Sequence, residues 1–459
     1  MKKMLLFYLC LVLLTSCSIN QLFHDTPPIA KTVAPASQTM LIGIDIRNLE
    51  TEDIIYQQNQ EMIFTPASTL KLFTTYLALK QAGKDYQFST EFMASGEIRD
   101  SILYGNLYIK ASGDPTLGSF YMKQGSQSPF IQWQIELKGK GIKTITGNLY
   151  LIRAGQKANP YRPGWLFDDY GLAFQNEITE FSYQNNLVLF NIVSDSSGIH
   201  IKQDSLLIER PVSNQLKQGD INQIRLRQTI NEAPVISGSI QKNSQNQLRH
   251  SISESENYFM ESFKRYMQQQ SLLNENAVFE IISPHPNYPD SLTLLFRLTS
   301  PPLDSICQVI NKYSINPFAE QVNTYLIKAD FRQENLKAMG IDTKVSIFDD
   351  GSGLSIYNKI KPSDFSKLMA EIYHSDLFPS YLRTLSVGGE DGTLKNRLTS
   401  GLLKGKIYGK SGSMRNINNV VAFYQSPQGN WYSVVILANN IPAGSNINSL
   451  LESVSLELP

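Results

Sequence analysis

The sequence predicts a mixed α/β (α+β) fold, in which helices flank an antiparallel sheet and a large β-rich segment is inserted into the domain that contains this sheet. Two strand-like segments lie near the start of the chain, at 39–47 and 54–58. Three more lie near its end: 405–414, 418–426 and 431–439. Since a long apolar helix follows the first pair, we expect one domain built from both ends of the chain, with helices on the faces of its sheet.

The first helix is predicted to run from residue 65 to about Ala82. Thr65 suits the N-cap, Pro66 suits the first helical position and Gly83 suits the C-terminal stop. Apolar side chains lie on nearly all sides of this helix. We therefore expect it to be buried in the middle of the domain.

The segment between the two halves has the pattern of a β-rich insertion. From about 92 to 285, short alternating stretches such as 103–110 and 146–152 are broken by Gly, Asn, Ser and Asp. A polar stretch at 237–256 precedes a predicted helix at about 257–270. Beyond the insertion, the pattern predicts two helices and a short terminal helix: 303–312, 317–329 and 445–455.

The chain begins with a targeting segment. Two lysines precede a short apolar run from Met4 to Leu14, and Leu14-Thr15-Ser16-Cys17 places a cysteine where a signal peptidase would cut. This resembles the lipobox of bacterial lipoproteins, which implies a signal peptide at 1–17 and a diacylated Cys17. The alternative is an ordinary cleaved signal with an incidental cysteine. Residues 18–37 contain three prolines and are expected to form a tether.

Charge, hydropathy and cysteine content argue against binding to nucleic acid, a second membrane-crossing segment and an internal disulfide. The 41 basic and 41 acidic residues balance, so no global charge favours binding to nucleic acid. After the first twenty residues, no apolar run is long enough to cross a bilayer. With Cys10 removed and Cys17 lipidated, Cys307 would stand alone and could form no internal disulfide. Its apolar surroundings predict a position in the core.

The first chemical signal is Ser68-Thr69-Leu70-Lys71. A spacing of three residues on a helix puts Ser68 and Lys71 on one face, where a neutral lysine amine can take the proton of the serine hydroxyl. Near the start of a helix, the N–H of Ser68 is also free to stabilise an oxyanion. The same pattern recurs from Ser239 to Lys242, but in a polar stretch without a capped apolar helix. Taken alone, the pattern leaves a structural serine at 68 as an equal alternative.

Two weaker signals lie in the second half of the chain. Lys410-Ser411-Gly412-Ser413 falls in a predicted strand, where the lysine and the hydroxyl suit a substrate carboxylate and the glycine allows close approach. The alternative is an ordinary lysine on an exposed edge strand. Ser314-Ile315-Asn316 lies at the break between two predicted helices, where side chains can enter a cleft. The alternative is that Ser314 or Asn316 caps the second helix.

Together and in this order, Ser-x-x-Lys, Ser-x-Asn and Lys-Ser-Gly resemble the active-site motifs of penicillin-binding proteins and serine β-lactamases. Lys71 and Ser314 are 243 positions apart. That separation resembles the large insertion of class C low-molecular-mass penicillin-binding proteins, the D-alanyl-D-alanine carboxypeptidase/endopeptidase family. Further stretches are similar to the same family: 105–108, 112–117, 300–303, 350–355 and 391–397.

The resemblance implies a transpeptidase/β-lactamase-like catalytic domain formed by residues 38–90 and 290–459. It also implies a β-rich insertion at 91–289 with a smaller nested domain near 185–236. The implied activity is that of a serine-type D-Ala-D-Ala carboxypeptidase or endopeptidase acting on peptidoglycan stem peptides, with β-lactam antibiotics as covalent inhibitors and no metal or organic cofactor. The expected location is the cell envelope, where a lipid anchor would hold the protein facing the periplasm, in the outer membrane.

The resemblance assigns the reaction to the first two motifs. Ser68 would be the acylated nucleophile and Lys71 its general base. Ser314 would relay a proton to the leaving amine, and Asn316 would hold the amide of the substrate.

The third motif would bind the end of the substrate. Lys410 and Ser411 would receive the terminal carboxylate, and the N–H groups of Ser68 and Ser413 would form the oxyanion hole. The family usually has threonine at the position of Ser411. Since serine keeps the hydroxyl, we expect little loss from this difference.

Two other departures concern the side-chain preference for the substrate. Ile356 stands where relatives commonly carry an arginine that binds the diamino-acid side chain of the peptide, which puts that preference in doubt. Trp165-x-x-Asp168 resembles a substrate-lining motif of the insertion, but the aromatic residue expected at Ala173 is absent or displaced. Asp168 is the candidate for this role and Asp169 is its competitor.

Other chemistries lack their motifs. Neither Gly-x-Ser-x-Gly nor His-Glu-x-x-His occurs in the sequence, and the five histidines show no paired pattern. Two alternatives to the carboxypeptidase remain. One is a β-lactamase or esterase on the same fold, and the other is a non-catalytic lipoprotein that binds peptidoglycan.

Overall fold

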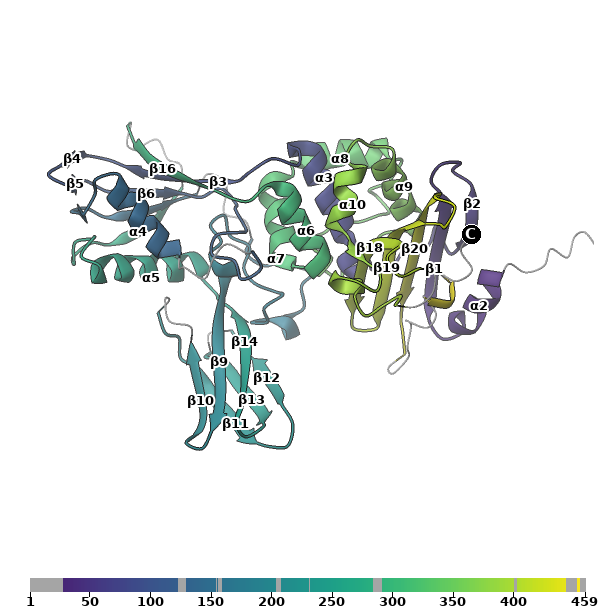
Figure 1. Cartoon of the computed structure of the whole chain (residues 1–459), viewed down its shortest axis with the longest axis horizontal. Coiled ribbons are helices and arrows are strands. Elements are labelled where there is room, and N and C mark those ends of the chain that lie inside the picture. The colour runs from purple at the N-terminus through teal and green to yellow at the C-terminus, as the bar shows by residue number, and fades with distance from the viewer. Residues whose placement is uncertain are drawn as a thin grey trace, which may run out of the picture.

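The computed structural model describes residues 28–122, 129–153, 155, 159–203, 208–230, 232–283, 291–399, 403–442 and 452–454. They form an elongated molecule, with a sheet and its helices at one end and a β-rich part at the other (Figure 1). The predicted signal segment with Cys17, and most of the helix predicted at 445–455, lie outside the described residues. Within the described part, no helix has both the length and the apolar character that crossing a bilayer requires.

Strands from both ends of the chain form the main sheet: β1 (Leu41–Asn48), β2 (Ile54–Gln58), β17 (Ser386–Val387), β18 (Ile407–Met414), β19 (Ile417–Gln425) and β20 (Trp431–Asn439). Their order is β17-β18-β19-β20-β1-β2, and every pair is antiparallel. β1 pairs with β20 along its whole length, from Leu41 opposite Asn439 to Asn48 opposite Tyr432. The predicted antiparallel sheet built from both chain ends is confirmed.

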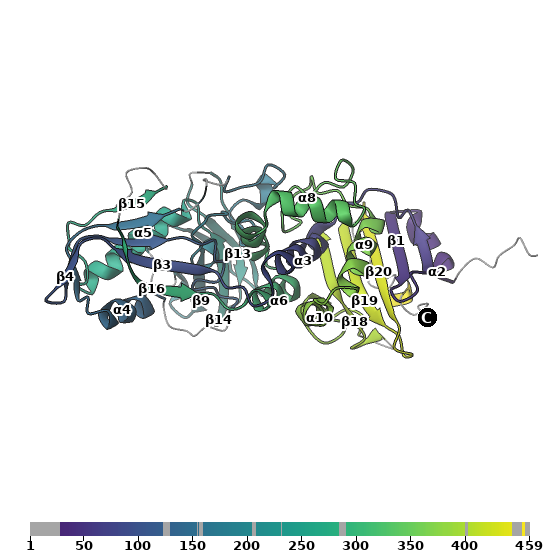
Figure 2. The same cartoon turned by 90° about the horizontal axis from the view of Figure 1, so that it is seen from above.

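Helices cover both faces of this sheet, because apolar residues of its central strands point to both sides. Val421 and Phe423 of β19 share one core with most of the helices, whereas Val420 and Ala422 share another with the helix at Pro28–Ser37. Figure 2 shows the larger group over one face of the sheet. These helices are α3 (Lys71–Ala82), α6 (Leu303–Tyr313), α7 (Asn316–Gln321), α8 (Ala329–Ala338), α9 (Pro362–Tyr373) and α10 (Phe378–Thr384).

Helix α2 (Pro28–Ser37) corrects the prediction of a tether at 18–37. Its side chains Ile29 and Val33, one turn apart, are buried against the second face of the sheet. Of the prolines that suggested a tether, Pro28 occupies the first position of this helix, where the missing N–H is not needed, and Pro35 lies within its last turn. The prediction is wrong for residues 28–37, and residues 18–27 lie outside the described part.

The helix that carries Lys71 begins later than predicted. A 3₁₀ turn, η1 (Ala67–Leu70), precedes α3, and its first residue has a left-handed backbone with φ 48°. Thr65 is not an N-cap, since its N–H donates to Asn439 Oδ1 and its carbonyl oxygen accepts from Asn419 Nδ2. These partners lie 374 and 354 residues away along the chain, so the local pattern could not reveal them.

The predicted helix at 317–329 is a composite. α7 continues through a π-helical turn, Val322–Leu326, before α8 begins. Ser314 ends α6 in a left-handed conformation with φ 60°. The N-cap of α7 is Ile315, and no side chain forms a capping hydrogen bond there. The alternative interpretation, that Ser314 or Asn316 caps this helix, is therefore wrong.

The β-rich insertion is built around a five-stranded sheet in which α4 and α5 share the core. Aromatic side chains fill this core: the ring of Phe92 stacks on Phe296, and Phe130 contacts Trp133 and Phe263. The elements are β3 (Ser89–Ala94), β6 (Leu107–Lys110), α4 (Pro129–Gly139), β8 (Leu149–Ile152), α5 (Ser255–Gln269), β15 (Phe279–Ile282) and β16 (Thr293–Thr299), with a small sheet of β4 (Glu97–Arg99), β5 (Ile102–Tyr104) and β7 (Thr144–Ile145).

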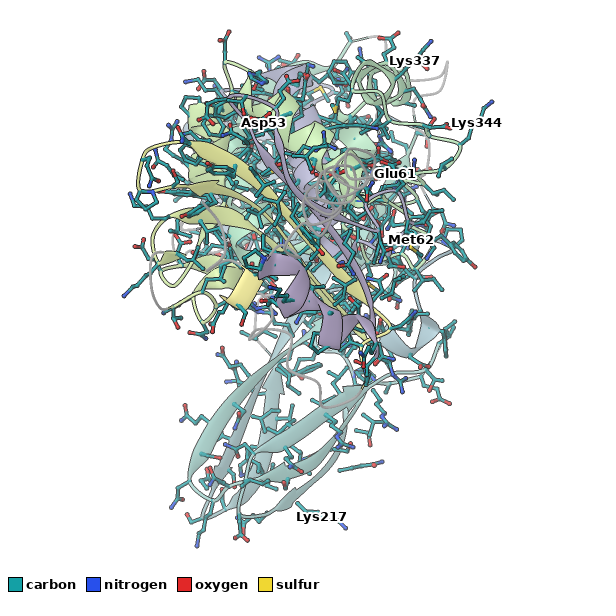
Figure 3. All side chains as sticks on the ribbon, turned by 90° about the vertical axis from the view of Figure 1, so that its right-hand side faces the viewer. Asp53, Glu61, Met62, Lys217, Lys337 and Lys344 are labelled. Carbon is teal, nitrogen blue, oxygen red and sulfur yellow. The ribbon has the colours of Figure 1, made fainter. Side chains whose placement is uncertain are left out.

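Two three-stranded sheets project from the insertion, with Lys217 at their far tip (Figures 1 and 3). Their strands begin at Leu187 and end at Ser251, so they continue past 236, the predicted end of the nested domain. Most of the stretch at 237–256, expected to be merely polar, is therefore strand. The strands are β9 (Leu187–Asp195), β10 (Gly198–Gln203), β11 (Ser213–Gln218), β12 (Gln223–Arg227), β13 (Val235–Ile240) and β14 (Ser244–Ser251).

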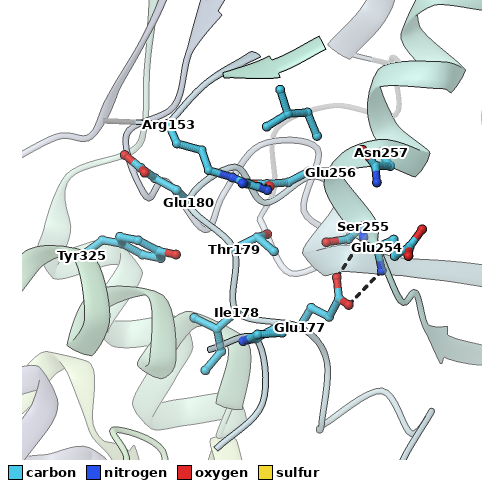
Figure 4. Close-up of a pocket in the computed structure, with 12 residues that line it drawn as sticks. Arg153, Glu177, Ile178, Thr179, Glu180, Glu254, Ser255, Glu256, Asn257 and Tyr325 are labelled. Carbon is cyan, nitrogen blue, oxygen red and sulfur yellow. Dashed lines mark hydrogen bonds and ion pairs between the residues drawn. The ribbon is translucent and has the colours of Figure 1, made fainter. Parts of the chain in front are cut away.

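Residues 159–183 of the insertion contact the helices that pack around α3. Gln321 of α7 donates to the carbonyl oxygen of Thr179 in this segment, at 2.7 Å. Thr179 also lines a cavity, together with Tyr325 and the first residues of α5 (Figure 4). There the Glu177 carboxylate accepts hydrogen bonds from two backbone N–H groups at the start of α5. The insertion is thus bonded to the helices next to the Ser-x-x-Lys motif.

Candidate active site

Ser68 lies in η1, directly after the left-handed Ala67. It is partly exposed, whereas Lys71, the first residue of α3, is fully buried. Asn419 Nδ2 donates to the carbonyl oxygen of Thr65, and it also donates to the carbonyl oxygen of Pro66 at 2.8 Å. A non-glycine residue adopts positive φ only where its surroundings impose it. The buried amides of the sheet therefore hold the turn that presents the Ser68 hydroxyl.

The Nζ atom of Lys71 contacts three oxygen atoms. It lies 3.0 Å from Ser68 Oγ, 2.6 Å from Asn316 Oδ1 and 2.6 Å from the carbonyl oxygen of Ser352. Ser68 and Lys71 are within reach as the spacing predicts, although a 3₁₀ turn and an α-helix share the four residues. Asn316 is 245 residues away along the chain. The structure thus brings the first two predicted motifs together.

Burial lowers the pKa of Lys71 to about 7. The negative charges of Asp350 and Glu320 act in the opposite direction and keep the pKa from falling further. Near neutral pH, a substantial share of the protein therefore carries an uncharged amine 3.0 Å from the Ser68 hydroxyl. Such an amine can accept the proton of the serine.

The loop at 350–355 forms a wall behind Ser68. The carboxylate of Asp350 organises it by accepting hydrogen bonds from two of the loop's own N–H groups, at 2.8 and 2.7 Å. Gly353 is left-handed, with φ +81°, and a Cβ there would lie 1.8 Å from the carbonyl oxygen of Ala67. Glycine is therefore required for the loop to approach the turn before Ser68.

The insertion also reaches this wall. The indole N–H of Trp165 donates to Asp350 Oδ2 at 3.0 Å. Asn316 Nδ2 donates to the carbonyl oxygen of Phe174 at 3.0 Å, while its Oδ1 accepts from Lys71. Two residues next to the amine are thus positioned by residues of the insertion.

Glu320 of α7 was not singled out from the sequence, yet it holds the loop that contacts the amine. Its Oε1 atom accepts hydrogen bonds from two successive backbone N–H groups, of Gly351 and Ser352, at 2.9 and 2.7 Å. The carbonyl of the same Ser352 accepts from Lys71. Burial, reinforced by the charge of Asp350, raises the pKa of the Glu320 carboxyl to about 7. Its one sequence signal is its place one helical turn after Asn316.

Strand β18 brings the third motif to the same place. Lys410 is fully buried, and its Nζ donates to the carbonyl oxygen of Ser411 at 2.6 Å. β18 lies inside the sheet between β17 and β19, so the alternative of an ordinary lysine on an exposed edge strand is wrong. A Cβ on Gly412 would lie 3.0 Å from the backbone N of Ser68. The glycine therefore permits contact between the strand and the turn, and the exposed Ser413 follows it.

Burial lowers the pKa of Lys410 well below its usual range, and the positive charges of Lys71 and Arg397 act in the same direction. Ser411 is buried and Ser413 is exposed. Ser314 is partly buried at the end of α6, and within the described residues its hydroxyl forms no hydrogen bond. Ser314 is two residues from Asn316, so its segment reaches the site, but among the described residues its hydroxyl forms no hydrogen bond with Ser68 or Lys71.

The structure separates the two candidate aspartates. Asp168 is exposed, whereas Asp169 is partly buried, and burial together with the charge of Asp168 raises the pKa of Asp169. Phe174, one residue after the expected aromatic position, is 42% exposed, and its carbonyl contacts Asn316. The backbone N–H of Ile356 donates to the carbonyl of Gly164 in the insertion at 3.1 Å. This bond holds Ile356 next to the segment of the insertion that carries Trp165.

The sequence pattern that defines the D-Ala-D-Ala carboxypeptidase 3 (S13) family matches residues 28–455, nearly the whole chain. The chain belongs to this family. The S13 assignment confirms the family resemblance of the three motifs and the hydrolase class that it implies.

Individual relatives of the S13 chain are distant in sequence. It is 24% identical to D-alanyl-D-alanine carboxypeptidase DacB of Haemophilus influenzae, over 88% of this chain and 86% of the relative. It is 22% identical to the D-alanyl-D-alanine carboxypeptidase of Actinomadura sp. (strain R39), over 89% of this chain and 80% of the relative.

A solved structure supports the fold at similar coverage. The crystal structure of penicillin binding protein 4 from Haemophilus influenzae superposes with a TM-score of 0.77 at 22% identity, covering 93% of this chain and 98% of that chain. The same protein complexed with a β-lactam gives a TM-score of 0.74 at 21% identity, with the same coverage. This likeness confirms the penicillin-binding-protein fold, insertion included.

Proposed function

We propose that this S13 chain hydrolyses the terminal D-Ala-D-Ala bond of peptidoglycan stem peptides through an acyl-enzyme on Ser68. The observation that carries the proposal is the buried Lys71 amine, 3.0 Å from Ser68 Oγ, with a pKa of about 7. A lysine in that state is a base at neutral pH, and the partly exposed serine is open to a substrate.

In the acylation step, uncharged Lys71 takes the proton of Ser68, and the Oγ atom bonds to the carbonyl carbon of the penultimate D-alanine. The N–H groups of Ser68 and Ser413 stabilise the oxyanion. Ser314 passes a proton from Lys71 to the nitrogen of the leaving D-alanine as the C–N bond breaks. A water molecule, deprotonated by Lys71, then hydrolyses the ester and frees Ser68.

Substrate binding in this proposal uses the remaining motif residues. Asn316 holds an amide of the peptide, the Ser411 hydroxyl faces its terminal carboxylate, and Lys410 supplies positive charge from behind the strand. β-Lactams carry an amide and a carboxylate in a similar arrangement and would acylate the same serine. The named activity of the relatives from Haemophilus influenzae and Actinomadura supports this substrate class. Cross-linked peptides, with a longer leaving group, are cleaved by the same steps.

The test is the release of D-alanine from a peptide ending in D-Ala-D-Ala. The wild-type chain should release it, and Ser68→Ala should not, while the matched variant Ser239→Ala, in the second Ser-x-x-Lys sequence, should keep full activity. Release by Ser68→Ala at the wild-type rate would remove Ser68 from its role. Rapid turnover of penicillin, instead of a long-lived adduct, would favour the β-lactamase alternative.

We also propose that Cys17 carries a lipid that anchors the protein in the outer membrane, facing the periplasm. The sequence before Cys17 supports this, and the residue lies outside the described part of the chain. Fractionation of cells tests it: the wild-type chain should sediment with outer membranes, and Cys17→Ser should not. Equal membrane association of both chains would contradict the proposal.

A further inference from the structure

Two cations beside the third motif lack an acidic partner. Within the described residues, neither Lys410 nor Arg397 forms an ion pair. By contrast, the neighbouring Lys312 pairs with Asp391. Removing a charge from water without a counter-charge is costly. The positive end of the site is thus suited to an anion that arrives from outside.

The register of the strands places Arg397 on the substrate side of β18. Its Nη1 atom donates to Asn418 Oδ1 at 2.9 Å. Asn418 of β19 lies opposite Ser413 of β18, and cross-strand partners point to the same face. Because side chains alternate along a strand, Ser411 shares that face with Ser413. The guanidinium therefore lies over the face that carries both hydroxyls.

The loop that carries Arg397 is anchored on both sides. Its Asp391 pairs with Lys312 at the end of α6 and accepts a hydrogen bond from the N–H of Val387 at 2.8 Å. The carbonyl oxygen of Arg397 itself accepts from the N–H of Gly389 at 2.9 Å. These bonds fix the backbone from which the guanidinium extends.

Most of the donors of this guanidinium remain available. Arginine has five N–H donors, and in the described structure one of them is used on Asn418. Arg397 is half-buried, and within the described residues its remaining donors form no hydrogen bond. Its planar fork suits two parallel hydrogen bonds to one carboxylate.

We propose that Arg397 binds the terminal carboxylate of the peptide, beside the hydroxyls of Ser411 and Ser413. This inference rests on the acyl transfer proposed above and adds to that function a residue that recognises the free C-terminus. Lys410, on the opposite face of the strand, supplies positive charge behind the site. The chain therefore selects peptides with a free carboxylate over peptides whose C-terminus is neutral.

The test compares one peptide that ends in D-Ala-D-Ala with the same peptide as its C-terminal amide. Wild-type kcat/KM should be higher for the free acid. Arg397→Gln should lower kcat/KM for the acid by roughly 10- to 100-fold, the range expected for hydrogen bonds to a charged group, and for the amide by less than about threefold. Arg397→Lys keeps the charge but not the planar fork. Its kcat/KM for the acid should lie between those of the wild type and Arg397→Gln.

Arg225→Gln, an exposed arginine on the distant strand β12, is the matched control and should change neither value. Acylation by penicillin and by its methyl ester gives a second pair with and without the carboxylate, and should respond in the same way. Equal losses on both members of a pair, or no loss on either, would overturn the inference. A wild-type chain that cleaves neither peptide and is acylated by neither β-lactam would overturn the proposed function itself.

Discussion

Lys71 combines features that rarely coexist in one side chain. It is fully buried, yet its Nζ has three oxygen partners, and two carboxylates are close enough to raise its pKa. Burial favours the neutral amine and the carboxylates favour the ammonium ion. The balance, a pKa of about 7, suits a group that must accept and return a proton at neutral pH.

We therefore predict that acylation of Ser68 by penicillin becomes faster as pH rises through about 7 and then levels off. The rate rises with pH because the Lys71 amine is a base only when it is unprotonated, above its pKa. Stopped-flow measurement of the acylation rate tests this. A rate that is constant between about pH 5 and pH 9 would contradict the assignment of Lys71 as the base. Lys71→Arg, which stays protonated, should lower the rate by roughly 10²–10⁴.

A second prediction concerns Glu320, whose negative charge raises the pKa of Lys71. Glu320→Gln keeps an oxygen that can accept the two loop N–H groups but removes the charge. The midpoint of the pH profile should therefore move to lower pH, with less than about a tenfold change of the rate on the plateau. The measurement is the same acylation profile. Glu261→Gln, on α5, should leave the midpoint in place, and an unmoved midpoint in Glu320→Gln would contradict the account.

At the residue scale, the sequence predicted those contacts that depend on spacing. The spacing of three positions from Ser68 to Lys71 puts their side chains within reach whether the backbone is α-helical or 3₁₀. Ser314, Asn316 and Lys410 were weak candidates by local pattern alone, and their roles came from the resemblance of their motifs to a family. Glu320 was missed, since its partners are backbone N–H groups about thirty residues away and no side-chain motif marks it.

At the scale of elements, two glycines let separate parts of the chain meet at Ser68. Gly353 brings the 350–355 loop against Ala67, and Gly412 brings β18 against Pro66 and Ser68. A Cβ on Gly412 would lie 2.8 Å from the carbonyl oxygen of Pro66, which is backbone and cannot rotate away. Two rigid elements can pack this closely only where a side chain is absent.

Gly412→Ala should therefore separate the strand from the turn and slow acylation by at least roughly 100-fold, the loss expected when reacting groups are misplaced by about 1 Å. The acylation rate with penicillin measures this. The matched variant is Gly139→Ala at the end of α4, where an added Cβ meets nothing within 4 Å. Wild-type acylation by Gly412→Ala would show that the close approach does not matter.

Element boundaries were predicted where the signal is local. The three C-terminal strands match to within two residues because alternation and a turn define them. The predicted start of the helix at 65 was wrong, and so was the predicted tether for residues 28–37, because distant partners decide both. Asn419 and Asn439 hold Thr65, and the sheet covers Ile29 and Val33 of α2.

At the scale of the whole molecule, the insertion helps to position residues of the catalytic site. Trp165 and Phe174, both from the insertion, bond to Asp350 and Asn316, and these two residues interact with Lys71. Figure 1 shows the insertion beside the helices that cover the main sheet. The sequence indicated a large insertion, but hydrogen bonds between segments so far apart leave no local pattern.

Trp165→Phe tests this coupling, because it keeps an aromatic side chain and removes the N–H that donates to Asp350 Oδ2. Acylation should slow by about tenfold, equivalent to ~1.4 kcal/mol. Tyr266→Phe removes a hydrogen bond to Gln134 that lies wholly within the insertion, and it should not affect the acylation rate. If both variants were acylated at the same rate as the wild type, the insertion would have no part in positioning the site.

The central claim is that Ser68 attacks the substrate while Lys71, one turn away, holds its proton. Mass spectrometry of the protein after reaction with penicillin, followed by proteolysis, tests it most directly. The account predicts one added penicillin per chain, located on the peptide that contains Ser68, and no addition in Ser68→Ala. An adduct on any other peptide, or an unmodified wild-type chain that is properly folded, would contradict it.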